Sequence, residues 1–249
     1  MCYDIQQMGD KIIRQAERQL GIEHFELKQL EFKFFHVSGF AHPQVMVISS
    51  EKPDTLVPMQ WGLIPPWIKS HEDAIKISNQ TLNARNDSVF TKPSFRQLIL
   101  KRRCIIPING FYENRDIGGK KYPYFIYRAE EEPLLLGGLW NRWTDTETGE
   151  VLETFSIITT DANALMSKIH NNKLRMPLII KPEDKLRWLD TTLNKEDVEK
   201  LMQPYDGNDL KAHTVSKLVN RKKDFTNVPE ISQPFSYPDL EYFDEKNKN

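Results

Sequence analysis

Cys2 is the position at which the sequence indicates the most distinctive chemistry. Cellular aminopeptidases remove an initiator Met that precedes a small residue, so processing of Met1 would make Cys2 the first residue. It would then carry an α-amine with a pKa of about 8 beside a thiol with a pKa of about 8.5. The amine can condense with an aldehyde to an imine, which the thiol closes into a five-membered thiazolidine. Because this closure is intramolecular, the aldehyde would be captured durably. A cysteine without function in a frayed terminus is the alternative interpretation.

Residues farther along the chain supply groups that could assist such a reaction. Glu113 ends an apolar stretch that runs from a strand into a turn, and His170 closes a predicted helix. Carboxyl and imidazole groups are common general acids and bases. Asn83 and Arg85 lie together between turn signals, and Arg175 begins a later strand. Each has a plainer interpretation as a surface carboxylate, a histidine that interacts with a helix dipole, a turn cap or a surface ion pair.

Two tryptophans, Trp61 and Trp67, flank a loop that consecutive prolines stiffen. Such a loop could present an aromatic ring to a nucleic-acid base, a contact worth about 1–3 kcal/mol. Core packing accounts for at least one of the two rings. Basic clusters at residues 101–103 and 221–223 could follow a phosphate backbone, although short charged runs are usually solvated faces. Cys104 lies in an apolar strand and is predicted to be inert core.

The composition excludes several classes of protein. The 34 Lys and Arg residues nearly balance the 35 Asp and Glu residues, and a net charge of -1 argues against coating duplex DNA or anionic membrane by bulk charge. The longest nearly apolar run, residues 134–140, is far shorter than the roughly 20 residues that span a bilayer. No signal peptide is recognisable, so we expect a cytoplasmic protein without a membrane partner. The 2 cysteines are too few for a zinc site, and neither metal nor cofactor is predicted.

Hydrophobic periodicity predicts helices at the two ends of the chain. The first covers residues 7–20 with Gly21 at its C-cap, and later helices are predicted over residues 161–170, 182–189 and 194–202. Between them, short β-rich runs separated by turn residues predict strands, namely residues 32–37, 45–49, 103–108, 124–128, 134–139, 155–160 and 177–180. This order indicates an α+β fold with a mainly antiparallel sheet. We expect one domain over residues 1–235 and a flexible tail over residues 236–249.

Four motifs occur in sequence order. They are the cysteine after the initiator Met, Asn-Ala-Arg at residues 83–85, Arg-Cys-x-x-Pro-x-x-Gly-x-Tyr-Glu at residues 103–113, and a histidine shortly before Arg-Met-Pro at residues 175–177. In these motifs the chain resembles the SOS response-associated peptidase (SRAP) family. Trp-Gly-Leu-Ile-Pro at residues 61–65 also matches, and the resemblance covers about residues 1–230. It implies a barrel-like, mainly antiparallel β core with a few peripheral helices.

The resemblance also implies an activity. Cys2 would form a covalent thiazolidine with the ring-opened aldehyde of an abasic site in single-stranded DNA, including junctions with duplex DNA. This crosslink would shield the lesion from strand cleavage in the response to DNA damage, with the protein acting as a monomer on the nucleoid. The implied catalytic residues are Cys2, Glu113 as general acid and base, His170 as proton-transfer partner, and Asn83, which would orient the cysteine or the sugar. The implied DNA contacts are Arg85 at a phosphate, together with Trp61, Trp67 and Arg175.

The chain departs from the family pattern in two places. Tyr3 and Asp4 follow the cysteine where many relatives have Gly-Arg, which removes a phosphate contact and adds a repulsive charge. Residues 171–174 lengthen the segment between His170 and Arg-Met-Pro.

Two other functions stay open at this point. A thiol peptidase would use Cys2 with His170 as its base, although a nucleophile at the N-terminus suits self-cleavage better than turnover. A non-covalent binder of single-stranded DNA would need no reaction at Cys2. A covalent adduct with abasic DNA distinguishes the first hypothesis from both.

Overall fold

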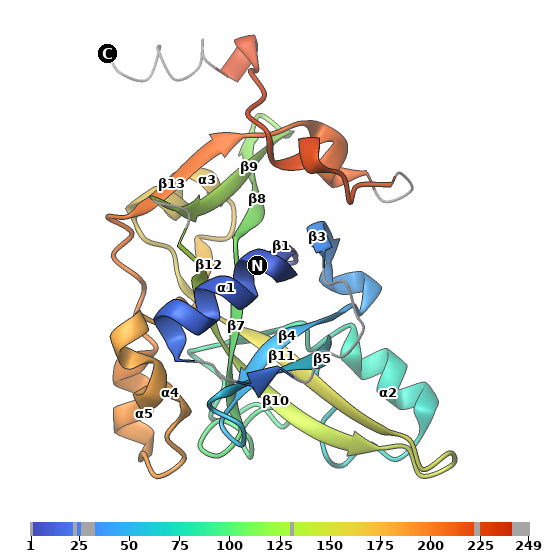
Figure 1. The fold of residues 1–249 in the computed structure, drawn as a ribbon. Helices are drawn as coiled ribbons and strands as arrows, with labels where there is room; N and C mark the ends of the chain where they lie inside the picture. Colours follow the sequence, from blue (N-terminus) through green and yellow to red (C-terminus); the bar gives the residue numbers. More distant parts are fainter. Residues whose placement is uncertain (1, 22–23, 26–32, 130–131, 222–224, 241–249) are drawn as a thin grey trace.

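Five strands close into a barrel at the centre of the fold (Figure 1). The computed structural model describes residues 2–21, 24–25, 33–129, 132–221 and 225–240. The barrel strands are β4 (Gln44–Ser49), β5 (Thr55–Trp61), β7 (Arg103–Ile108), β10 (Leu134–Thr144) and β11 (Val151–Asp161). Neighbours are antiparallel except where β5 meets β11 in parallel, with Trp61 opposite Phe155. One parallel pair is unavoidable, because strand direction cannot alternate around a ring of five.

A second sheet lies above the barrel in Figure 1. Its five strands are all antiparallel, in the order β13 (Leu210–Thr214), β9 (Lys120–Arg128), β8 (Gly110–Ile117), β1 (Asp4–Met8) and β3 (Lys33–Ser38). Only Asn109 separates β7 from β8, so the chain passes directly from the barrel into this sheet. A Cβ atom at Gly110 would lie 2.7 Å from the carbonyl oxygen of Ile126, so the crossing requires a glycine.

Short strands and helices surround the two sheets. β2 (His24–Phe25) pairs with β5, and both β6 (Asn83–Arg85) and β12 (Arg175–Pro177) pair with β11. The helices are α1 (Gly9–Leu20), α2 (His71–Ser78), α3 (Ala164–Ile169), α4 (Lys185–Leu189) and α5 (Lys195–Leu201), with 3-10 turns at Gly39–Ala41, Pro182–Asp184, Lys217–Asn220 and Pro229–Ser232. Among the described helices, none has the length and apolar character needed to cross a bilayer.

The barrel strands are buried on both faces. In β4, Val45 and Val47 belong to one apolar cluster, whereas Met46 and Ile48 belong to another, as the two-residue period of a strand requires. The first cluster extends to Cys2, and the second extends to α4 and α5. The core therefore continues from the barrel to Cys2.

A buried glutamine fixes β1 to the barrel. Gln7 has no exposed surface, and its Nε2 donates to the carbonyl oxygens of Met46 at 3.0 Å and Pro107 at 2.8 Å. Its Oε1 accepts from the backbone N–H of Met46 at 2.8 Å. One side chain thus satisfies three buried backbone groups on β4 and β7.

The predicted α+β class with a barrel-like, mainly antiparallel core is confirmed. The strands predicted over residues 45–49, 103–108, 124–128, 134–139 and 155–160 lie within β4, β7, β9, β10 and β11. Of the strand predicted over residues 32–37, Phe32 is outside the described residues and the remainder lies in β3. The strand predicted over residues 177–180 is displaced toward the N-terminus, because β12 ends at Pro177 and only a bridge from Ile179 to Leu136 continues it.

The bounds of other helices and strands differ from the prediction because contacts between distant residues override the local sequence pattern. The predicted helix over residues 7–20 begins at Gly9, since the residues before it form β1 between two other strands. The predicted turn before Glu113 is the start of β8, and α2 and β13 were not predicted. The helix predicted over residues 161–170 begins later, because Asp161 completes β11 and Asn163 caps α3.

The tail predicted to begin at residue 236 is packed in its first part. The hydroxyl of Tyr237 donates to the carbonyl oxygen of Val215 at 2.7 Å, and Leu240 is buried in a cluster with Tyr122 of β9. The rest of the predicted tail, residues 241–249, lies outside the described residues.

Replacing Gln7 by Met tests the anchor of β1. We expect Gln7→Met to lower the free energy of unfolding by about 3 kcal/mol, because buried backbone groups that lose a partner cost about 1–3 kcal/mol each. Urea denaturation measures the change. Gln44→Met, at an exposed position of β4, is the control. Equal stability of the two variants would contradict the role of Gln7.

Candidate active site

Cys2 lies immediately before β1 and is fully buried. The backbone around it is held on two sides. The Nδ2 of Asn83 donates to the carbonyl oxygen of Cys2 at 3.0 Å, and the N–H of Gly39 donates to the carbonyl oxygen of Tyr3 at 2.7 Å. The backbone of Cys2 and Tyr3 is therefore fixed by β6 and by the turn that follows β3.

The carboxyl group of Glu113 lies beside Cys2. β1 and β8 pair with Asp4 opposite Tyr112, so the same register sets Glu113 against Tyr3. Glu113 is buried, and this burial raises the pKa of its carboxyl to about 7. Burial also raises the pKa of the Cys2 thiol, and the charge of Glu113 raises it further. At neutral pH the site therefore holds a protonated thiol and a carboxyl group divided between its two forms.

His170 ends α3 and faces the same carboxyl group. Its Nδ1 lies 2.8 Å from the carbonyl oxygen of Arg175, and because a carbonyl only accepts, Nδ1 carries the hydrogen. In the neutral ring, Nε2 then carries the lone pair, and it lies 3.8 Å from Oε2 of Glu113. Burial lowers the pKa of the imidazole to about 4. His170 is therefore a neutral base beside a carboxylic acid.

Asn83 contributes a second polar atom to the site. β6 pairs in parallel with β11, which places Asn83 opposite Ile157. The Oδ1 atom of Asn83 is buried and accepts no hydrogen bond from the residues that the structure describes. A buried acceptor of this kind suits an N–H or O–H donor of a ligand or of a processed N-terminus.

The four residues predicted to be catalytic thus lie on four elements that meet at one place. Cys2 precedes β1, Asn83 lies on β6, Glu113 on β8, and His170 at the end of α3. The arrangement provides a thiol, an acid of pKa about 7 and a neutral base in one buried site. Such a set can add a nucleophile to a carbonyl carbon and move the protons that this addition requires.

Two of the predicted DNA contacts are inaccessible in this structure. Trp61 is fully buried, with its Nε1 donating to the carbonyl oxygen of Leu82 at 2.9 Å and its ring stacked on Phe155. Gly39 also packs on the indole, so Trp61 is a core residue. Arg175 is 5% exposed, and its guanidinium donates to Asp161 at 2.7 Å and to Asn86 at 2.9 Å. These partners brace Arg175 within the fold, and its contact with DNA stays a prediction.

The other predicted contacts lie at the surface. Trp67 is 43% exposed, and its contact with a base stays a prediction. Arg85 is exposed and pairs with Asp87 through two guanidinium nitrogens, so a phosphate would have to displace that carboxylate.

The basic clusters and Cys104 also include residues that solvent does not reach. In the cluster at 101–103, the guanidinium of Arg103 is buried against the carbonyl oxygens of Ile99 and Trp188, so it does not reach solvent. In the second cluster, residues 222–223 lie outside the described residues. Cys104 is buried, and burial raises the pKa of its thiol, as suits an unreactive core residue.

Two contacts beside Cys2 were not predicted from the sequence. Asp4 adds a negative charge that raises the pKa values of Cys2 and Glu113, after the larger effect of burial, and it lies 3.2 Å from Nε2 of His36. The ring of Tyr3 packs on Phe40, which is 54% exposed. The pairing of β1 with β3 creates both contacts, and no short motif encodes a pairing between distant strands.

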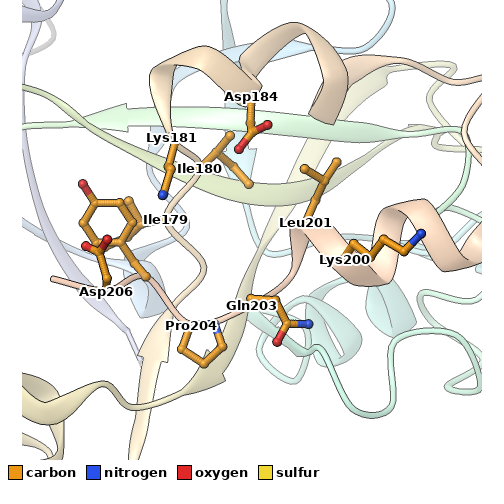
Figure 2. Close-up of a pocket in the computed structure, with 10 residues that line it drawn as sticks. Ile179, Ile180, Lys181, Asp184, Lys200, Leu201, Gln203, Pro204 and Asp206 are labelled. Carbon is orange, nitrogen blue, oxygen red and sulfur yellow. The ribbon is translucent and has the colours of Figure 1, made fainter.

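A separate cavity of about 270 Å³ lies between the segment after β12 and α5 (Figure 2). It is lined by charges of both signs, Lys181, Asp184, Lys200 and Asp206, and by none of the predicted site residues. Within the described part of the chain, no three His, Cys, Asp or Glu side chains group so as to hold a metal ion.

Comparison with known proteins agrees with these features. A family model described as SOS response associated peptidase (SRAP) matches residues 12–222. The abasic site processing protein YoqW of Bacillus subtilis is 37% identical over 221 residues, which cover 84% of this chain and 92% of that protein. The abasic site processing protein HMCES of Gallus gallus is 35% identical over 214 residues, which cover 78% of this chain and 61% of that protein.

A solved structure shares the fold. The crystal structure of a protein from Bacteroides thetaiotaomicron superposes with a TM-score of 0.83 at 37% identity, covering 94% of this chain and 100% of that one. The family predicted from the four motifs is therefore confirmed, and the chain belongs to the SOS response associated peptidase (SRAP) family.

Proposed function

We propose that this protein recognises abasic sites in single-stranded DNA and captures their ring-opened aldehyde covalently through Cys2. The relatives YoqW and HMCES are named abasic site processing proteins. The observation that carries the proposal is the convergence of Cys2, Asn83, Glu113 and His170 in one buried site, although they lie far apart in the sequence. Capture would shield the lesion during the response to DNA damage.

The reaction balances without an oxidant or a cofactor. After removal of Met1, the α-amine of Cys2 attacks the aldehyde carbon and forms a carbinolamine. Loss of one water gives the imine. The sulfur of Cys2 then bonds to the imine carbon while its proton passes to the nitrogen, which closes the thiazolidine. The site must therefore deliver one proton to the departing hydroxyl and carry another from sulfur to nitrogen.

Glu113 is suited to both proton transfers because burial sets its pKa at about 7. In its acid form it can protonate the ring oxygen of the closed sugar or the departing hydroxyl, and as a carboxylate it can accept the thiol proton. The lone pair on Nε2 of His170 can accept a hydrogen bond from a sugar hydroxyl. The Oδ1 of Asn83 can accept an N–H of the Cys2 amine. Burial also favours the neutral amine, which is the nucleophile.

The electrostatics disfavour a thiol peptidase. A cysteine peptidase needs a thiolate, which a protonated histidine stabilises. Here burial raises the pKa of Cys2 and lowers that of His170, so both groups shift away from the thiolate–imidazolium pair. A non-covalent DNA binder would not need the convergence of these residues, and the adduct assay separates the two possibilities.

The direct test is intact mass of the Met-free protein before and after incubation with a single-stranded abasic oligonucleotide. We expect a denaturation-resistant adduct equal in mass to protein plus DNA minus one water. Cys2→Ala keeps an α-amine but cannot close the ring, so its adduct should survive only after borohydride reduction of the imine. No adduct with the parental protein would refute the proposal, and release of fragments from a peptide pool would favour the peptidase.

Glu113→Gln should slow adduct formation by about 10²-fold or more, because the amide can neither donate nor accept a proton at the required steps. Single-turnover rates on denaturing gels measure the effect. Glu150→Gln, at an exposed position in the turn before β11, is the control and should react at the parental rate. A parental rate for Glu113→Gln would remove Glu113 from the mechanism.

The pKa values of Glu113 and His170 predict opposite effects of pH on stability. For Glu113, burial raises the pKa from 4.5 to about 7, so its stabilising contribution is present below pH 4.5 and is lost as the pH rises through 7. For His170, burial lowers the pKa from 6.5 to about 4, so its contribution is present above pH 6.5 and is lost as the pH falls through 4. In the parental protein the two slopes oppose each other.

Each single variant should show the pH dependence of stability that the other residue causes. We expect the free energy of unfolding of Glu113→Gln to rise with pH between about 4 and 6.5, and that of His170→Gln to fall between about 4.5 and 7. Urea denaturation at several pH values gives both profiles. If both profiles run parallel to the parental one, the pair does not exchange its proton on folding.

A further inference from the structure

The turn at residues 171–174, between α3 and β12, is built rigidly at the edge of the candidate active site. Asn171 forms two hydrogen bonds with the backbone of Asp116 on β8, its Nδ2 donating to the carbonyl oxygen at 2.7 Å and its Oδ1 accepting from the N–H at 3.0 Å. The N–H of Leu174 donates to the carbonyl oxygen of His170 at 2.9 Å. The N–H of Ala162 donates to the carbonyl oxygen of Leu174 at 3.0 Å. Both ends of the turn are thus tied to the elements that carry Glu113 and His170.

Leu174 adopts a backbone conformation that glycine or asparagine would adopt more easily. Its φ is +51°, and its side chain is 52% exposed. A non-glycine residue in this region costs about 1–3 kcal/mol, and such strain is common at functional sites. The hydrogen bonds of the turn involve only the backbone of Leu174, so they do not require its side chain. These contacts therefore do not explain why an apolar side chain is exposed at a strained position.

Lys173 is a cation at this edge that a ligand can reach. Arg85 and Arg175, which the sequence assigned to DNA, are paired with Asp87 and Asp161. Lys173 is exposed, and no carboxylate among the described residues lies within ion-pair distance of it. Its charge contributes to lowering the pKa of His170, after the larger effect of burial, which sets the ammonium within electrostatic reach of the ring.

We infer that the turn at residues 171–174 is a DNA-contacting element of the site, in which the Lys173 ammonium binds a backbone phosphate beside the lesion and Leu174 packs against an adjacent unstacked base. The inference rests on the proposed function, because it places the abasic sugar at Glu113 and His170. A phosphate on either side of that sugar then lies at the rim where Lys173 is exposed. The contact supplies a positive charge to a site where Asp4 has replaced a cation with a negative charge.

The experiment measures binding separately from chemistry. A single-stranded oligonucleotide with a tetrahydrofuran abasic analogue has no aldehyde, so fluorescence anisotropy reports non-covalent affinity alone. We expect Lys173→Gln to reduce the slope of log affinity against log salt by about 0.7, the value for one phosphate contact on a single strand. Lys92→Gln, at an exposed position in the segment between β6 and β7, is the matched control and should keep the parental slope.

Leu174→Gly separates contact with DNA from support of the fold. Glycine relieves the strain at φ +51° and keeps the backbone hydrogen bonds, so the free energy of unfolding should not fall. Affinity for the analogue should still fall about fivefold or more, because the apolar surface of Leu174 would no longer be buried against a base. A parental salt slope for Lys173→Gln, or parental affinity for Leu174→Gly, overturns the inference.

The two proposals fail in distinguishable ways. If the parental protein forms the covalent adduct while the turn variants bind the analogue like the parent, the turn is not a DNA contact and the proposed function stands. If the parental protein forms no adduct, the proposed function fails, whatever the salt slopes are.

Discussion

Because β1 pairs with β8 in antiparallel register, Cys2 lies against the part of β8 that carries Glu113. β1 is also paired with β3 on its other edge, and Gln7 bonds it to β4 and β7 of the barrel. A chain terminus usually frays because few contacts hold it. Here strands on both edges and a buried side chain fix the direction in which Cys2 enters the core. Strand pairing therefore places the Cys2 thiol beside the Glu113 carboxyl group.

Burial decides the protonation state of the site. In water, a carboxyl group and an imidazole at neutral pH would be a carboxylate and a partly charged ring. At 3.8 Å inside the protein, the attraction between two charges does not repay the loss of their hydration, so Glu113 shifts toward the acid and His170 toward the neutral base. Folding therefore raises the proton affinity of the glutamate and lowers that of the histidine. The same low polarity keeps the Cys2 thiol protonated, which suits a nucleophilic amine followed by ring closure.

The residues of the candidate site could be predicted from the sequence more readily than the elements that hold them. The motifs around Asn83, Glu113 and His170 have residue types and spacing that can be recognised locally, and the central strands follow from their apolar alternation. The start of β1 could not be predicted, because residues 7–20 show a helical period and only pairing with β3 and β8 makes their first part a strand. The exposure of Trp61 and Arg175 depends on partners that lie on distant strands, such as Phe155 and Asp161. The exposure of neither side chain could be predicted from the local sequence pattern.

β11 sets the distances within the site because it pairs on both edges. Thr159 lies opposite Arg85 of β6 on one edge and opposite Pro177 of β12 on the other. The two strands therefore keep Asn83 and the end of α3 at a fixed separation. The guanidinium of Arg175 reinforces this across β11, since it donates both to Asn86, which follows β6, and to the carbonyl oxygen of Thr159. The backbone of Arg175 meanwhile accepts the hydrogen of His170 Nδ1, which leaves Nε2 directed at Glu113. Arg175, which the sequence analysis assigned to DNA, thus fixes the tautomer and orientation of His170 from inside the fold.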